Sequence, residues 1–164
     1  MASERTAAQY GKQGEVRRDP MAMLPFCGYN MADYFQHWLD MGQKVTNPPA
    51  IFYVNWFRTD DEGKFIWPGF GENVRVLRWI AQRCAGSDQD KAQKTPIGYI
   101  PADGALDLSG LDLPDGIIQE LLHIDNQAWL NELTDQREFF AKFGDRLPQE
   151  IITELDALEQ RLRE

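Results

Sequence analysis

Positions 56–73 read Trp-Phe-Arg-Thr-Asp-Asp-Glu-Gly-Lys-Phe-Ile-Trp-Pro-Gly-Phe-Gly-Glu-Asn, and the rest of the chain is organised around this stretch. It holds five aromatic residues and three glycines, in a chain that is only 12% aromatic overall. Aromatic rings on a rigid scaffold can hold a flat ligand, and glycines let that ligand approach the backbone. Spacing alone favours a plainer interpretation, in which the stretch is a hairpin whose aromatic side chains fill a core. The residues by themselves leave both interpretations open.

The residues that lead into and through this stretch predict a β-hairpin. The β-branched and aromatic run at 51–57 carries the strongest strand signal in the chain. An acidic turn follows at 60–63, and residues 64–67 can return as a short partner strand. We therefore expect a short aromatic hairpin at 51–67.

A helix is predicted directly after the hairpin. It begins at Glu72 and Asn73 and ends near Gly86, which suits a left-handed C-terminal cap. The free amides of its first turn would face whatever lies beside Phe70 and Gly71, a favourable place for an electronegative ligand atom. The expected inward positions are Val74, Val76, Leu77 and Ile80, and the expected outward positions are Arg75, Arg78 and Arg83.

Helical periodicity predicts four further helices, so the fold class is α+β and mainly helical. Their start signals are Asn30, Pro114, Asp125 and Pro148. Residues 87–94 are expected to form a charged loop, and 97–101 a short extended piece. The apolar positions that recur at helical spacing are Tyr34, Phe35, Trp38, Leu39 and Met41 in the first helix, Trp129, Leu130, Leu133 and Phe140 in the third, and Ile151, Ile152, Leu155, Leu158 and Leu162 in the last.

Composition narrows the range of functions. The 164 residues suit one domain, and the formal net charge of −9 opposes broad nucleic-acid binding, including single-strand binding through exposed aromatics. No run approaches the apolar length of a membrane span. Cys27 and Cys84 lack metal-ligand spacing and are expected to be reduced thiols of a cytoplasmic protein.

The sequence contains no motif of a complete catalytic site. It has no phosphate-binding loop of the Gly-x-x-x-x-Gly-Lys type, no dinucleotide fingerprint and no nucleophile elbow. His37 and His123 are its only histidines, too few for a zinc cluster. We therefore predict no catalytic residue and no metal ligand, and a chain that binds something flat at most.

Four strings of the sequence resemble GTP-dependent phosphoenolpyruvate carboxykinase. Residues 19–30 read Asp-Pro-Met-Ala-Met-Leu-Pro-Phe-Cys-Gly-Tyr-Asn, and residues 52–58 read Phe-Tyr-Val-Asn-Trp-Phe-Arg. The other two strings lie at 65–77 and 95–101, and the Trp-Pro-Gly-Phe-Gly-Glu-Asn segment of the former is highly specific. The resemblance spans nearly the whole chain, although the helical tail at 114–164 matches in pattern more than in residues. It indicates the C-terminal region of that enzyme.

The resemblance implies a role in the binding of GTP and GDP. The family converts oxaloacetate and GTP to phosphoenolpyruvate, carbon dioxide and GDP in gluconeogenesis, with manganese and magnesium. In the implied guanine pocket at 56–73, the rings of Phe57, Phe65 and Phe70 surround the base, and Asn73 forms a hydrogen bond with its edge. Trp56 and Trp67 remain structural and support the packing. Glu72 is either an acceptor for guanine N–H groups or a helix N-terminal carboxylate. The implied nucleotide-binding residues are Phe57, Phe65, Phe70, Gly71, Glu72 and Asn73.

The resemblance also implies that this chain is part of a larger enzyme. Residues 1–19 are similar to part of a mobile lid and its linker and are expected to be disordered, while 20–164 would belong to the larger mixed α/β nucleotide-binding domain of a monomeric parent. The phosphate-binding loop, metal ligands and catalytic lysine of the family lie upstream, so we expect that Met1 is not the natural beginning of the enzyme and that the chain alone is inactive. A protein-interaction module that uses the aromatic hairpin and the helical tail is the alternative.

Overall fold

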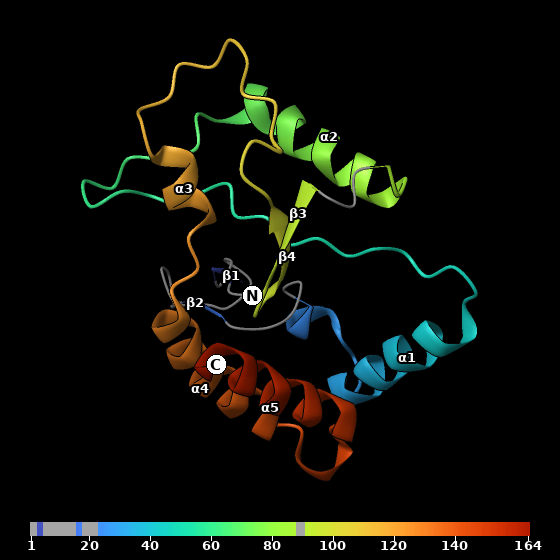
Figure 1. Cartoon of the computed structure of the whole chain (residues 1–164). Coiled ribbons are helices and arrows are strands. Elements are labelled where there is room, and N and C mark those ends of the chain that lie inside the picture. Colours follow the sequence, from blue (N-terminus) through green and yellow to red (C-terminus); the bar gives the residue numbers. More distant parts are fainter. Residues whose placement is uncertain (1–2, 5–15, 18–22, 88–90) are drawn as a thin grey trace. The chain divides into compact units, whose positions relative to one another are not determined.

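The computed structural model describes residues 3–4, 16–17, 23–87 and 91–164 (Figure 1). Their fold is mainly helical with a short antiparallel hairpin, which confirms the predicted fold class. The helices are α1 (Met31–Lys44), α2 (Asn73–Cys84), α3 (Ile117–Leu122), α4 (Asn126–Ala141) and α5 (Gln149–Arg163). The strands pair as β1 (Ser3–Glu4) with β2 (Val16–Arg17) and β3 (Ala92–Thr95) with β4 (Gly98–Pro101). Within these described ranges, no helix has both the length and the apolar character needed to cross a bilayer.

The chain divides into two compact units. The first comprises residues 1–48 and 125–164, and the second comprises residues 49–124. Most of the expected lid at 1–19 lies outside the described residues, and its described positions are the strands β1 and β2. The candidate site at 56–73 lies entirely within the second unit.

In the first unit, α1 packs on α4 through a small aromatic core. Met31, Phe35 and Phe139 are buried together. The Phe35 ring meets the Phe143 ring edge to face, at a centroid distance of 5.5 Å. As predicted, Asn30 caps α1, because its Oδ1 accepts from the Ala32 amide at 2.9 Å.

A second core cluster joins α4 to α5. Leu133, Leu155 and Leu162 are buried together, as the periodicity of the tail predicts. Asp125 caps α4 as expected, with its Oδ1 accepting from a backbone amide three residues on at 2.9 Å. Asn126 then donates from Nδ2 to the Leu162 carbonyl at 3.1 Å, which ties the start of α4 to the end of α5. α4 and α5 therefore form a packed helical hairpin.

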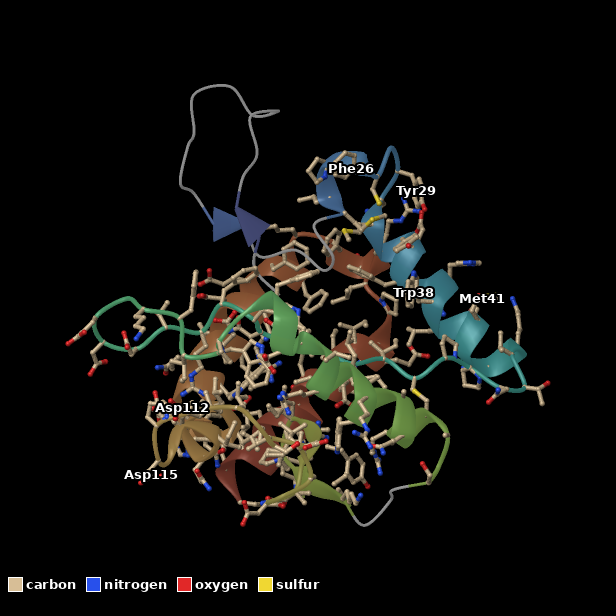
Figure 2. All side chains as sticks on the ribbon, turned by 90° about the horizontal axis from the view of Figure 1, so that it is seen from above. Phe26, Tyr29, Trp38, Met41, Asp112 and Asp115 are labelled. Atoms are coloured by element: carbon tan, nitrogen blue, oxygen red, sulfur yellow. The ribbon has the colours of Figure 1, made fainter. Side chains whose placement is uncertain are left out.

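Part of the apolar surface near α1 is open to solvent. Trp38 and Met41 belong to the predicted apolar stripe of α1, yet both are exposed. Phe26 and Tyr29, which precede the helix, are exposed as well. Figure 2 shows these four side chains along α1 and the segment before it. Only the first half of the helix is buried, because no described element of this unit covers the second half.

In the second unit, α2 is anchored by Trp79. This side chain is buried, and its indole N–H donates to the Lys91 carbonyl at 3.0 Å. The Phe52 ring packs on its edge at 6.2 Å. The hairpin of β3 and β4 follows, and Arg83 of α2 stacks over Tyr99 at 5.1 Å. These contacts connect α2 to the hairpin within the unit.

Three predictions about this unit are wrong in detail. The run at 51–57 is not a strand, because its β-branched residues find no partner strand among the described residues. The hairpin lies instead at 92–101, which includes part of the expected charged loop. Val74 and Leu77 of α2 are exposed rather than inward, since Trp79 sets which face of the helix is buried.

Candidate functional site

Phe57 and Phe65 come from the two arms of a tight loop. Thr59 and Phe65 form an isolated antiparallel bridge, the remnant of the predicted aromatic hairpin. The turn closes on Asp60, whose Oδ1 accepts from two backbone amides farther along the turn, at 3.0 and 2.9 Å. At its tip Gly63 has a φ of 79°, a conformation that favours glycine. The acidic turn therefore holds the two arms together and brings the two phenylalanines into contact.

The two rings form a pair that faces solvent. Their centroids are 5.9 Å apart and their planes are inclined by 61°, an edge-to-face arrangement. Phe57 is 71% exposed and Phe65 is 57% exposed, while the third expected ring, Phe70, is 94% exposed. Among the ring contacts of the described residues, none joins Phe70 to the other two. The structure therefore brings two of the three predicted rings together and leaves the third separate.

Asn73 is held by an indole from the same loop. Trp67 is only 5% exposed, and its Nε1–H donates to Asn73 Oδ1 at 2.8 Å. Trp67 also lies beside Trp56, with centroids 6.4 Å apart, in keeping with the supporting role expected of this pair. The contact ties the first residue of α2 to the arm that carries Phe65.

The segment between Trp67 and Asn73 turns sharply. Gly69 has a φ of 111° and precedes the 3₁₀ helix η3 (Phe70–Glu72), so the residue at this position must be one that tolerates positive φ. In η3 the amide of Glu72 donates to the Gly69 carbonyl, and that of Asn73 donates to the Phe70 carbonyl. Two amides expected to be free for a ligand are thus used by the turn itself.

Glu72 and Arg75 form the start of a polar network. The Arg75 Nε donates to Glu72 Oε2 at 2.5 Å, and its guanidinium also donates to the carbonyls of Asp107 and Ser109 at 2.5 and 3.1 Å. Hydrogen bonds from the side chain and the amide of Ser109, with Arg78 and Arg75 nearby, lower the pKa of Asp107. The Glu72 carboxylate is thus paired with Arg75 at the start of α2.

The sequence did not indicate two of the contacts that build the site. Trp67 was expected only to pack, and Arg75 was expected to point outward. The Pro-Gly pair at 68–69 is the signal that could have suggested a reversal between Trp67 and Asn73. Across the described ranges, no group of three or more His, Cys, Asp and Glu side chains is placed to hold a metal ion.

Comparisons with known proteins agree with the resemblance. The family model described as "Phosphoenolpyruvate carboxykinase C-terminal P-loop domain" matches residues 1–161. The chain is 54% identical over 165 residues to phosphoenolpyruvate carboxykinase (GTP) of Neocallimastix frontalis. It is 50% identical to the protein of the same name from Chlamydia muridarum and 51% identical to that from an Anaeromyxobacter species, each over 163 residues.

Each of these alignments covers 99% of the chain but only 27% of the relative. The chain therefore spans about a quarter of the length of the curated proteins that it matches. The family model matches almost the whole chain, and this match establishes the family to which the chain belongs. This chain belongs to the GTP-dependent phosphoenolpyruvate carboxykinase family and corresponds to a segment of its C-terminal domain.

Proposed function

We propose that this chain supplies the guanine-binding element of a GTP-dependent phosphoenolpyruvate carboxykinase. The observation that carries the proposal is the solvent-facing pair of Phe57 and Phe65, tied through Trp67 to an amide at the start of α2. In the complete enzyme, oxaloacetate and GTP would give phosphoenolpyruvate, carbon dioxide and GDP. The part assigned to this chain is recognition of the nucleotide base.

The rings supply affinity without choosing a base. Stacking of a base on an aromatic side chain contributes about 1–3 kcal/mol and works with every base, because every base has a π-face. Phe57 and Phe65 expose enough ring surface for this role. Phe70 would complete the stack by closing over the base. Its ring is exposed in η3, so no packed neighbour among the described residues opposes this movement.

Selection of guanine requires polar groups at the edge of the base. Guanine presents the acceptor O6 where adenine presents an N6 amino donor. The Oδ1 of Asn73 is occupied by Trp67, and no described group accepts from its Nδ2 donors. At Gly71 an added Cβ would meet no atom within 4 Å, so the packing of the described residues does not itself require glycine there. Glu72, held by Arg75, keeps the first turn of α2 in place.

The reaction itself is not assigned to this chain. Manganese and magnesium prefer carboxylate and other oxygen ligands, and the described residues gather no such group. We therefore propose no metal ligand and no catalytic residue here, and we expect the chain alone to be inactive. The groups that bind the phosphates and metals would come from the rest of the enzyme.

The exposed apolar side chains suit contact with that remainder. In the first unit these are Phe26, Tyr29, Trp38 and Met41, and in the second Ile51, Tyr53, Val74 and Leu77. Apolar patches of this kind mark interaction surfaces. The same exposure supports the alternative function, a protein-interaction module that binds no nucleotide, and the following experiment separates the two.

We expect GDP to bind the chain weakly, at about millimolar concentration, because stacking and one edge contact act without phosphate-binding groups. In an ¹⁵N NMR titration GDP should shift the signals of residues 57, 65 and 70–73 more than ADP does. Phe57→Ala should weaken GDP binding roughly 5- to 150-fold through lost stacking. Phe26→Ala is the matched control, because it removes a ring of similar exposure (80%, against 71% for Phe57) from the other unit, and it should not change GDP binding.

The alternative function would be favoured by a specific result. If GDP shifts no signal between residues 56 and 73 while the spectrum remains that of a folded protein, the guanine-binding proposal is wrong for this chain. Equal losses in Phe57→Ala and Phe26→Ala would also contradict it, because they would indicate non-specific stacking on any exposed ring.

A further inference from the structure

The hydrogen bond between Trp67 and Asn73 determines which way the Asn73 amide faces. An indole N–H can only donate, so the atom opposite it must be the amide oxygen. The 2.8 Å contact therefore places Oδ1 toward Trp67 and directs Nδ2, with its two donors, away from the indole. Because Trp67 is buried, water cannot readily replace the amide oxygen as its acceptor.

We infer that Trp67 is the positioning residue for base selection, because it holds Asn73 as a hydrogen-bond donor toward the nucleotide. The inference rests on the proposed function and names the group that gives the site its preference. A free asparagine side chain can present either its oxygen or its amino group after a half-turn of the amide. Such a side chain accepts from adenine as readily as it donates to guanine.

The indole makes these two orientations unequal. With Oδ1 held by Trp67, the donors of Asn73 meet the O6 acceptor of guanine. To bind adenine the amide must turn over, which sets its amino group against the indole N–H and leaves a buried donor unpaired. The unpaired donor disfavours adenine nucleotide roughly 5- to 150-fold. Hypoxanthine keeps O6 but lacks the 2-amino group, so IDP should bind as GDP does.

The test is Trp67→Phe, measured with GDP, IDP and ADP by NMR titration of the whole chain. Phenylalanine keeps an aromatic ring but loses the N–H, so the amide becomes free to turn. GDP binding should then weaken only about twofold, since about half of the amides face the wrong way. ADP binding should tighten until the preference for guanine nearly disappears. General damage to the pocket would weaken both nucleotides, so tighter ADP binding distinguishes positioning from packing.

Trp79→Phe is the matched control. Trp79 is likewise buried, lies in the same unit and donates its indole N–H, but to the Lys91 carbonyl. This variant should retain the preference for GDP over ADP. If Trp67→Phe retains it as well, Trp67 does not position Asn73, although guanine binding by the wild-type chain would stand. If the wild-type chain binds neither nucleotide, the proposed function and this inference fail together.

A second measurement covers the case in which Trp67→Phe does not fold. In the wild-type chain, the indole N–H of Trp67 should exchange with solvent slowly, and GDP should shift the Asn73 side-chain amide signals without releasing that proton. Exchange of the Trp67 indole as fast as that of the exposed Trp38 indole would overturn the inference.

Discussion

Asn73→Asp should weaken GDP binding on the order of 10- to 100-fold and remove the preference for guanine over adenine nucleotide. Aspartate has nearly the same shape as asparagine, and one of its oxygens can still accept from the Trp67 indole at the 2.8 Å position. The change is confined to the outward atom, which turns from a donor into a charged acceptor. That acceptor repels guanine O6 and suits the N6 amino group of adenine.

The fold should tolerate this substitution. Residue 73 is the first residue of α2, where a negative side chain interacts favourably with the helix dipole by about 0.3–1 kcal/mol. A loss of GDP binding could therefore not be attributed to unfolding. The measurement is the same NMR titration with GDP, IDP and ADP, together with a thermal melt to confirm that stability is retained.

Asn55→Asp provides the matched control. Asn55 lies in the same unit, and its Oδ1 accepts from the Phe57 amide at 3.0 Å, so aspartate keeps that bond while adding the same charge. GDP binding should weaken much less there than in Asn73→Asp. A preference for GDP that survives Asn73→Asp but disappears with IDP would contradict the prediction. It would mean that the base turns to present its N1–H and 2-amino groups to the carboxylate.

The helices could be predicted from sequence because their signals are local. Asn30 and Asp125 cap α1 and α4 through side-chain bonds to amides only two and three residues away. Gly86 follows α2 with a φ of 69°, as its expected role at the helix end requires. Each of these interactions involves near neighbours, so the sequence contains all the information needed to place them.

The strand at 51–57 could not be predicted correctly because a strand depends on a distant partner. High β-propensity indicates that a segment would fit into a half-buried sheet, but it does not indicate that neighbouring strands are present to form one. Ile51 and Tyr53 remain exposed, and none of the described strands pairs with their segment. The prediction of the buried face of α2 was wrong for a similar reason. Periodicity identifies the apolar positions of the helix, but the bond from Trp79 to the Lys91 carbonyl decides which of them are buried.

At the candidate site, the family resemblance named the residues and the structure supplied relations between them. The rings of Phe57 and Phe65 were expected to act together, and they do meet. The bond from Trp67 to Asn73 crosses a turn whose direction depends on the positive φ of Gly69. Such a direction is a property of the folded backbone, so no spacing rule reveals which side of the Asn73 amide faces the indole.

Leu133→Ala should lower the free energy of unfolding of the first unit by about 2–5 kcal/mol. Leu133 is only 3% exposed and packs with Leu155 and Leu162 between α4 and α5. Removing its methyl groups loses burial and leaves a cavity that the two helices cannot fully close. Because small domains are stable by only about 5–15 kcal/mol, this loss should be visible as a large decrease in the urea midpoint.

Leu77→Ala is the matched comparison for Leu133→Ala. It deletes the same atoms, but from a position in α2 at which the leucine is 53% exposed. Alanine favours helix slightly more than leucine does, so propensity cannot account for a loss at either position. The exposed site should therefore change stability by no more than about 0.5 kcal/mol. An equal loss at both positions would mean that the apolar face of α2 is buried in the folded chain. Val74 and Leu77 would then be core residues, and they could not belong to the surface proposed to contact the rest of the enzyme.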